Sequence, residues 1–228
     1  MDNPYAAPST DIRQNEMEVA GAAPYTVTEM RSAFTRFAVS YWGYAALFAA
    51  LIGMSMMVVA KVAAAGAAGR DPELQLQNMQ GLVMSLGFVA LAWFASFVVM
   101  VVFASILIYR YWAVMQPYTK RTTPGKAVGF LFIPLFQFYW MFVAYHGLAK
   151  DIDAYLDRNR DSTAPRPSTG IVLATMIIGL LTIVPVINNF AALALLVMLF
   201  ITKLRLNNSI IGIIQDRSRQ LASAVPSK

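Results

Sequence analysis

Four side chains that could move a proton or hold a cation recur at helical spacing in one segment of the chain. They are His146, Lys150, Asp153 and Asp157, at positions i, i+4, i+7 and i+11, so they share one face of a helix. One interpretation is a proton relay or cation site at a membrane surface, with the imidazole titrating near neutrality. The alternative, which we favour, is the solvated stripe of an amphipathic helix, in which the lysine pairs loosely with the two aspartates.

Two prolines within apolar stretches are each followed three residues later by an amide side chain. Pro134 precedes Gln137, and Pro185 precedes Asn188 and Asn189. Proline removes a backbone donor and breaks a helix, so nearby groups must satisfy the freed backbone atoms. The amides could bind a substrate or an ion, as in transporters with broken helices. The simpler prediction, which we favour, is that they cap the breaks.

Two basic residues, Lys203 and Arg205, close the last apolar run. Long basic side chains at such a position extend to the lipid headgroups, so both are candidate headgroup contacts. A site for an anionic lipid such as cardiolipin is one interpretation, but the pattern is unspecific.

Several kinds of catalytic chemistry are not indicated. The chain has no cysteine and one histidine, which excludes disulfides, thiolate ligands and sites with several histidines. It carries no glycine-rich phosphate loop after a strand, no G-x-S-x-G elbow and no H-E-x-x-H motif. Every Asp and Glu lies outside the apolar runs. We therefore predict a protein that is not an enzyme and that binds no cofactor or metal.

The composition indicates a protein whose surroundings are largely lipid. Of 228 residues, 58% are hydrophobic and 13% charged, and the mean hydropathy is +0.55. A soluble domain has about twice that share of charge. The net charge of +6 is attributed to cytoplasmic flanks of membrane helices, and nucleic-acid binding is not expected. Four stretches carry no charged residue and are long enough to span a bilayer: 37–60, 74–109, 127–149 and 167–202.

These stretches predict an all-α polytopic membrane protein. Two long spanning helices precede two helix–break–helix units, at 126–157 and 169–206; the alternative is four single kinked spans. The first helix should begin at a capping box formed by Thr26 and Glu29. Within it, Ala45, Ala49 and Gly53 form a stripe that would let another helix approach.

Basic residues predict the orientation. If both units enter and leave on one side, all but Lys61 and Arg70 of the 18 Lys and Arg residues are cytoplasmic, whereas single spans leave six outside. The N-terminus is then cytoplasmic. We expect a disordered cytoplasmic leader over 1–25, a transmembrane helical domain over 26–213, and a polar C-terminal tail over 214–228. The leader shows no signal-peptide pattern.

Two segments carry a resemblance to a known group of proteins. They are the leader Asn3-Pro4-Tyr5-Ala6-Ala7-Pro8 and the segment from Thr123-Pro124-Gly125-Lys126-Ala127-Val128-Gly129 to Pro134, continuing as Phe138-Tyr139-Trp140 and Gly147-Leu148-Ala149-Lys150-Asp151. The chain resembles uncharacterised bacterial multi-span membrane proteins with a Pro-Gly-Lys-Ala-Val-Gly-type segment, many of which have Asn at the position of Gln137. The resemblance implies a location in the bacterial cytoplasmic (inner) membrane and implies no activity.

The function hypotheses follow from these patterns. The first is a non-enzymatic membrane interaction or scaffold protein whose partners are the lipid bilayer and either another membrane protein or a second copy of the chain. The alternative is a small transporter or channel with a site at the broken helices. An intramembrane enzyme ranks third.

Overall fold

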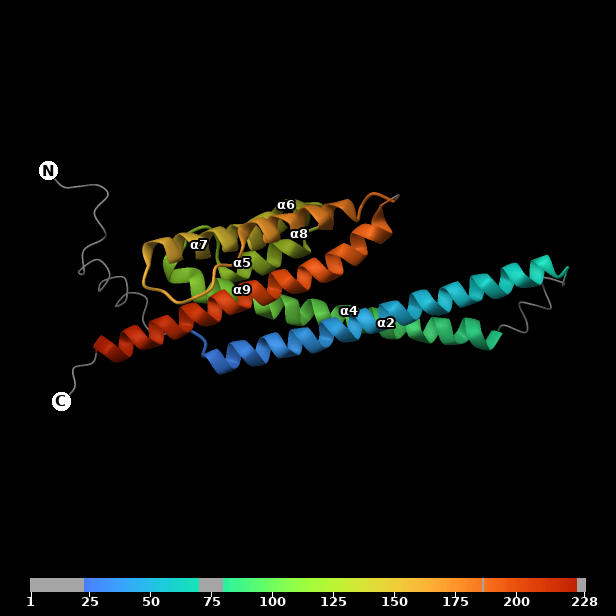
Figure 1. The fold of residues 1–228 in the computed structure, drawn as a ribbon, viewed down its shortest axis with the longest axis horizontal. Helices are drawn as coiled ribbons and strands as arrows, with labels where there is room; N and C mark the ends of the chain where they lie inside the picture. The colour runs from blue at the N-terminus through green and yellow to red at the C-terminus, as the bar shows by residue number, and fades with distance from the viewer. Residues whose placement is uncertain (1–22, 70–79, 186, 225–228) are drawn as a thin grey trace. The chain divides into compact units, whose positions relative to one another are not determined.

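The computed structural model describes residues 23–69, 80–185 and 187–224, and every regular element in these ranges is helical (Figure 1). Three helices are long and apolar enough to cross a membrane, over Val27–Ala67, Gln80–Tyr118 and Phe190–Ser223. The predicted all-α polytopic fold is confirmed. The elements in chain order are α2 (Val27–Ala67), α4 (Gln80–Met115), the 3-10 helix η1 (Gln116–Tyr118), α5 (Pro124–Gly129), the 3-10 helix η2 (Phe130–Phe132), α6 (Phe136–Met141), the π-helix η3 (Phe142–Gly147), α7 (Leu148–Arg158), α8 (Thr169–Leu181) and α9 (Asn188–Ala224).

The chain divides into two compact units, which are described separately. The hairpin unit comprises residues 1–34 and 105–228, and the long-helix unit comprises residues 35–104. The first holds the start of α2, the end of α4 and all the later helices. The second holds the remainder of the two long helices.

The start of α2 follows the predicted capping box. The Thr26 backbone N–H donates to Glu29 Oε2 at 2.7 Å, and the Glu29 N–H donates to Thr26 Oγ1 at 3.2 Å. These reciprocal bonds satisfy donors that the first helical turn leaves free. The helix ends before Gly69, whose φ of +65° is the left-handed conformation that glycine adopts without strain.

Aromatic packing joins the two helices of the long-helix unit. Tyr44 and Phe48 of α2 stack on Trp93 of α4, with ring centroids 5.7 and 5.8 Å apart, and Tyr44 also contacts Phe97. Large apolar side chains such as Phe88, which is 72% exposed, point away from the unit. Exposed apolar side chains on long helices are suited to lipid contact.

The predicted small-residue stripe of α2 is not in contact with α4 at Gly53. A Cβ added at Gly53 would meet no atom within 4 Å, whereas one added at Gly43 would lie 3.9 Å from Ser96 Oγ on α4. Gly53 therefore has no neighbour on α4, whereas Ala45 is half-buried and Ala49 is exposed. That this stripe lets another helix approach stays a prediction.

The first proline break reverses the chain. After η2, Leu135 adopts a φ of +63°, and the chain turns back into α6. The Trp140 indole N–H of α6 donates to the Ala127 carbonyl of α5 at 3.2 Å, and its ring packs edge-on against Phe130 at 4.8 Å. α5 and η2 together have nine residues, or about 15 Å of helix, which is half of a hydrocarbon core of about 30 Å.

The second break forms a longer hairpin, in which α8 and α9 lie side by side (Figure 1). Thr175 Oγ1 of α8 lies 2.7 Å from Thr202 Oγ1 of α9, and a Cβ at Gly179 would lie 3.8 Å from Leu195 Cδ1. As residue numbers rise along α8, their neighbours on α9 fall, so the helices are antiparallel. Both predicted helix–break–helix units therefore fold as hairpins, and the alternative of single kinked spans is wrong.

The described residues cover most of the predicted C-terminal tail and only the end of the predicted leader. α9 continues through residue 213 to Ala224 as one helix of 37 residues, so the C-terminal tail predicted from 214 is instead helical to that point. Asp216 and Arg217 are buried there, which explains why a polar composition does not mark a free tail. The predicted leader lies outside the described residues up to position 22.

Candidate functional site

The tips of the two hairpins are apolar. Leu135 is 81% exposed at the first tip and Phe190 is 79% exposed beside the second. Gln137 and Asn188 are exposed near the two turns, and the side chain of Asn189 is not described. Pro134 and Pro185 are likewise exposed turn residues. Of the predicted site residues whose side chains are described, Pro134, Gln137, Pro185 and Asn188 are therefore exposed at or near the turns.

Backbone groups close both breaks without the amide side chains. At the first tip the Gln137 N–H donates to the Ile133 carbonyl at 3.0 Å, and the Phe136 N–H donates to the Pro134 carbonyl at 2.7 Å. At the second, the Ala191 N–H donates to the Ile187 carbonyl at 2.9 Å. Among these described residues, the capping role expected of Gln137 and Asn188 falls to backbone carbonyls.

The predicted polar stripe is divided between two helices. His146 lies in η3, and Lys150, Asp153 and Asp157 lie on α7. Arg166 from the α7–α8 connection pairs with Asp157 at 2.6 Å and approaches Asp153 at 3.7 Å. Lys150 is exposed, and no ion pair joins it to the described carboxylates of this stripe. The expected loose pairing of the lysine is therefore replaced by an arginine from outside the helix.

The surroundings shift the pKa values of two groups in this stripe. Burial lowers the pKa of His146, and the positive charges of Lys150 and Arg121 lower it further. Burial raises the pKa of Asp153, against the opposing effect of Arg166. Both shifts disfavour the charged form, as expected where water is partly excluded. The geometry offers no chain of hydrogen bonds between the two groups that would make a relay.

A clamp that the sequence analysis missed holds the α4–α5 connection against α7. Arg121 forks onto Asp151, with Nε to Oδ2 at 3.0 Å and Nη2 to Oδ1 at 2.8 Å. Thr119 Oγ1 donates to the same carboxylate at 2.6 Å. Gly147 lies beneath the arginine, since a Cβ there would come within 2.9 Å of Arg121 Cδ. No periodicity in the sequence marks a contact between residues so far apart.

A second missed feature fixes the connection between α7 and α8. Asp216 of α9 is only 6% exposed and accepts three hydrogen bonds from this segment. Ser162 Oγ and the Thr163 N–H donate to its Oδ2, and Thr163 Oγ1 donates to its Oδ1 at 3.0 Å. We call residues 159–168 the latch segment, because one buried carboxylate holds it on α9.

Gly212 makes this close approach sterically feasible. A Cβ at this position would lie 2.6 Å from both Cα and Cβ of Ala164 and 3.2 Å from Cδ of Pro165. Gly212 and Asp216 are four residues apart and therefore share one face of α9. The sequence shows Gly212 one helical turn before Asp216, and Ser162 next to Thr163 in a connection. These two patterns are the signals from which the contact could have been predicted.

The structure places the two predicted headgroup contacts differently. Lys203 is 1% exposed, and its Nζ donates to Tyr145 Oη at 3.0 Å while lying 4.5 Å from the centre of the same ring. The prediction that it extends to the headgroups is wrong, because η3 packs over it and supplies a hydroxyl and an aromatic face. Arg205 remains exposed, and its Nη1 donates to Ser168 Oγ at 2.6 Å.

Buried indole and phenol groups complete this polar interior of the hairpin unit. The Trp112 indole N–H donates to the Ala144 carbonyl at 3.0 Å, and Tyr111 Oη lies 3.4 Å from the Lys203 carbonyl. Ala144 lies within η3, where a π-helix realigns backbone carbonyls relative to an α-helix. Side chains of α4 thereby connect η3 to α9.

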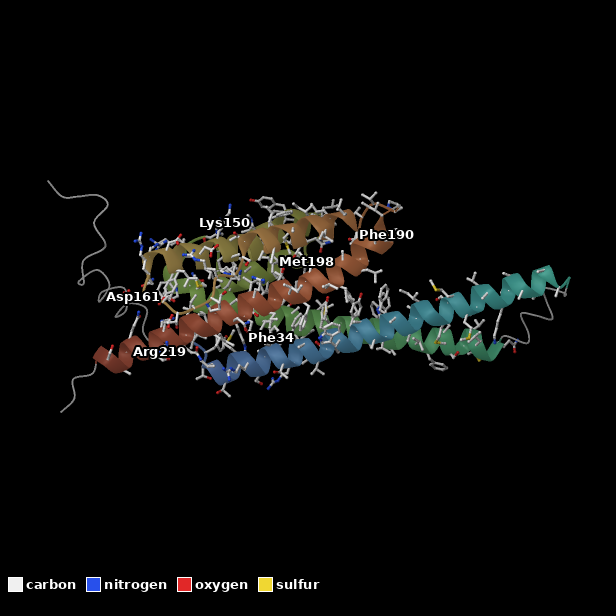
Figure 2. All side chains as sticks on the ribbon, viewed as in Figure 1. Phe34, Lys150, Asp161, Phe190, Met198 and Arg219 are labelled. Carbon is white, nitrogen blue, oxygen red and sulfur yellow. The ribbon has the colours of Figure 1, made fainter. Side chains whose placement is uncertain are left out.

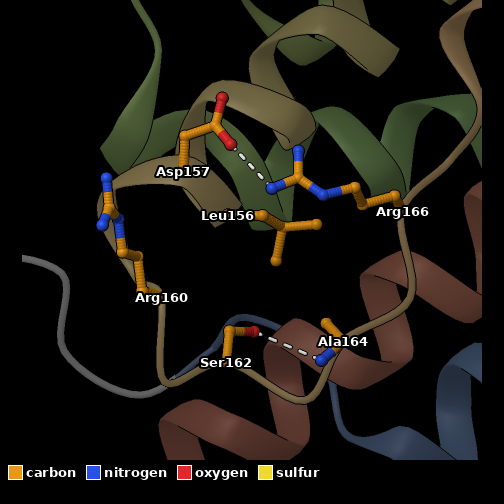
Figure 3. A pocket seen from close by; sticks show the side chains of 6 residues that line it. All are labelled: Leu156, Asp157, Arg160, Ser162, Ala164 and Arg166. Atoms are coloured by element: carbon orange, nitrogen blue, oxygen red, sulfur yellow. Dashed lines mark hydrogen bonds and ion pairs between the residues drawn. The ribbon is translucent and has the colours of Figure 1, made fainter.

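A cavity of about 440 Å³ in the hairpin unit lies between the latch segment and the end of α7 (Figure 3). Its lining residues are Leu156, Asp157, Arg160, Ser162, Ala164 and Arg166. Within the described ranges no group of three or more His, Cys, Asp or Glu side chains could hold a metal ion. The arrangement is therefore suited to binding a charged molecule through arginine.

Comparison with known proteins gives one partial match. Residues 74–164, about two-fifths of the chain, match the family model of the serpentine type 7TM GPCR chemoreceptor Str. No curated protein and no solved structure matches the chain. Together with the three long apolar helices, this match decides the class. The chain is an integral, multi-pass α-helical membrane protein. The match covers too little of the chain to show membership of the family.

Proposed function

We propose that this chain is a non-enzymatic interaction protein of the bacterial cytoplasmic membrane, whose partner binds the charged end of the hairpin unit. The observation that supports this most is the opposition between the two ends of that unit. Asp161 and Arg219 lie at one end and Phe190 at the other (Figure 2). The apolar end suits lipid, and the charged end suits a partner in water.

The charged end has a defined shape, which favours recognition by a partner. The Arg121–Asp151 fork, the Arg166–Asp157 pair and the hydrogen bonds to Asp216 all lie in this region. Ordering the backbone of one residue costs about 1–2 kcal/mol. A connection that only links two helices does not need this ordering, so the hydrogen bonds that hold this one indicate a further role. A preformed surface binds without that ordering cost at the moment of association.

The distribution of basic residues supports a cytoplasmic position for this end. Both hairpins begin and end at the charged end, and α8 with 13 residues spans about 20 Å, less than the hydrocarbon core of about 30 Å. Hairpins that return to one side leave only Lys61 and Arg70 of the basic residues outside. The resemblance to bacterial multi-span proteins supports the same membrane.

The transporter alternative gains no support from the described residues. The hairpin tips carry large apolar side chains, and their turns are closed by backbone hydrogen bonds. A transport site at broken helices needs polar groups at the membrane midplane, facing a cavity. The cavity described above is lined by the latch segment and the end of α7, and none of the residues at the proline breaks lines it.

Cysteine labelling in cells tests the orientation, and the chain contains no native cysteine. Arg158→Cys on the charged end should react only with reagent admitted to the cytoplasm. Ala68→Cys, beyond the far end of α2, should react only from outside, and Leu135→Cys at the hairpin tip should not react. Labelling of Arg158→Cys by an impermeant external reagent would refute the orientation.

Photo-crosslinking from matched positions tests the interaction. A photoreactive amino acid at Arg158 should capture a protein in cells, whereas the same amino acid at Phe190 should capture lipid. Both side chains are exposed, so the two positions are comparable in accessibility and differ in which end of the hairpin unit they probe. If the Arg158 position captures only lipid, or no protein above the level captured at Phe190, the proposal fails.

A further inference from the structure

The cavity beside the latch segment has walls of three kinds (Figure 3). Leu156 and Ala164 supply apolar surface, Arg160 and Arg166 supply guanidinium groups, and Asp157 faces Arg166. Its volume of about 440 Å³ is within the range of sites for small molecules, about 300–1,000 Å³. It is much larger than the space that a single water needs.

The cavity is built on a fixed frame. Ser162 donates to the buried carboxylate of Asp216 and accepts a hydrogen bond from the Ala164 N–H at 3.2 Å. The opposite wall belongs to the last turn of α7, where Leu156 is buried. The two walls therefore keep their separation without a ligand, which lowers the cost of binding one.

The two arginines differ in their present partners. Arg166 Nη2 donates to Asp157 Oδ1 at 2.6 Å, in an ion pair whose side chains are 58% and 67% exposed. Such an exposed pair contributes little stability and can be exchanged for another anion. Arg160 is exposed and forms no ion pair or hydrogen bond with the residues that the structure describes. One guanidinium group is thus available at once, and the second is available by exchange.

We propose that this cavity binds a phosphate ester, held between the guanidinium groups of Arg160 and Arg166. The planar guanidinium fork matches the spacing of phosphate oxygens and binds two of them together. A phosphate ester presents oxygens to both guanidinium groups, and its attached group fills the remaining volume against Leu156 and Ala164. Asp157 opposes the anion and keeps the affinity moderate.

A phosphate ester at this place has two sources, a soluble metabolite or the headgroup of an anionic lipid. The lining residues precede Thr169, where α8 begins, so the site lies on the charged side of the hairpin. The proposal concerns the ligand of this cavity and does not depend on a protein partner being captured.

The test uses the full-length chain in phosphatidylcholine nanodiscs. Calorimetry with glycerol 3-phosphate, a soluble phosphate ester, measures the soluble arm. Native mass spectrometry of lipid retained from phosphatidylglycerol nanodiscs measures the lipid arm. Arg160→Ala should weaken binding in the operative arm by about tenfold or more, and Arg160→Lys should weaken it less. Binding should also fall as salt is raised.

Arg158→Ala is the matched control, because this exposed arginine lies two residues away and does not line the cavity. Its binding should equal that of the unaltered chain. Protection of the Thr163 amide from hydrogen exchange verifies that each variant keeps the latch segment in place. Absence of binding in both arms, or an equal loss in Arg158→Ala and Arg160→Ala, would overturn the proposal.

Discussion

Gly212→Ala is expected to detach the latch segment from α9. The added Cβ would lie 2.6 Å from two carbon atoms of Ala164, about 1 Å closer than an ordinary carbon–carbon contact. One of these atoms is a backbone Cα, and Pro165 Cδ would lie 3.2 Å from the added Cβ. Side-chain rotation cannot relieve such a contact, so the segment itself must move.

The magnitude follows from what the movement would disrupt. Overpacking of a close contact costs about 1–3 kcal/mol. Moving the segment also lengthens the hydrogen bonds from Ser162 and Thr163 to the Asp216 carboxylate, each worth about 1.5–3 kcal/mol when fully formed. Alanine gains about 1 kcal/mol over glycine in a helix, which offsets part of this loss. We expect a net local destabilisation of about 2 kcal/mol.

Hydrogen exchange of the Thr163 amide measures this directly, since that N–H donates to Asp216 at 3.0 Å. A loss of about 2 kcal/mol lowers its protection about 30-fold, because 1.4 kcal/mol corresponds to a factor of ten. Gly170→Ala is the control, as it lies in α8 with no atom within 4 Å of the added Cβ. That variant should keep Thr163 protected and be slightly more stable.

The reasoning would be refuted if Gly212→Ala left Thr163 as protected as in the unaltered chain. The same conclusion would follow if both alanine variants raised the unfolding temperature equally. Either result would mean that Ala164 does not lie against α9 at this position.

Three further predictions concern the interior of the hairpin unit, and each is measured by thermal unfolding in mild detergent. Asp151→Asn removes the charge that Arg121 binds and should cost about 1 kcal/mol, since the arginine side chain is 43% exposed. Asp151→Glu should keep part of this stability, and no loss in Asp151→Asn would contradict the role of the ion pair. The pKa of His146 is lowered in the folded chain, so the unfolded chain binds the imidazole proton more tightly. The stability that neutral His146 allows is therefore complete above its ordinary pKa of 6.5 and is lost as pH falls below that value. His146→Gln should flatten this pH dependence of the unfolding temperature between about pH 7 and pH 5. Lys203→Met keeps the buried volume and removes the buried charge beside Tyr145, so it should be neutral or stabilising, whereas Lys203→Ala should cost about 2–5 kcal/mol; equal losses would contradict this account.

Local rules in the sequence predicted the helix ends and the breaks. The capping box at Thr26 and the proline breaks depend on neighbours within four residues, so the sequence carries all the information they need. The choice of hairpins over single spans came from the placement of the basic residues, which is a property of the whole chain. Both inferences were correct because lipid imposes few alternatives on an apolar helix.

The site residues were predicted less well, because their partners are distant in the chain. Lys203 is separated by 58 residues from Tyr145, and Asp216 by 53 from Thr163. The expectation that a basic residue at the end of an apolar run reaches the headgroups uses only the neighbouring sequence. It therefore placed Lys203 at the headgroups and not beside Tyr145. The prediction that the side chains of Gln137 and Asn188 cap the proline breaks was wrong for a different reason. A positive φ at Leu135 lets the backbone close its own turn, and Gln137 is left at the surface.

The position of the buried polar groups carries a functional argument of its own. Hairpins that only anchored the chain in lipid would need apolar tips, and a short polar connection between them could remain free. Instead Asp216 is buried in order to hold that connection, although burying a carboxylate requires several hydrogen bonds to be tolerated. Gly212 is placed one turn earlier, where any larger residue would push the connection away. Two independent residues of α9 thus maintain one shape at the charged end, and that shape frames the arginine-lined cavity. A fixed surface of this kind has its use in recognition, which is why the latch segment, rather than the hairpin tips, is the place to seek the ligand and the partner.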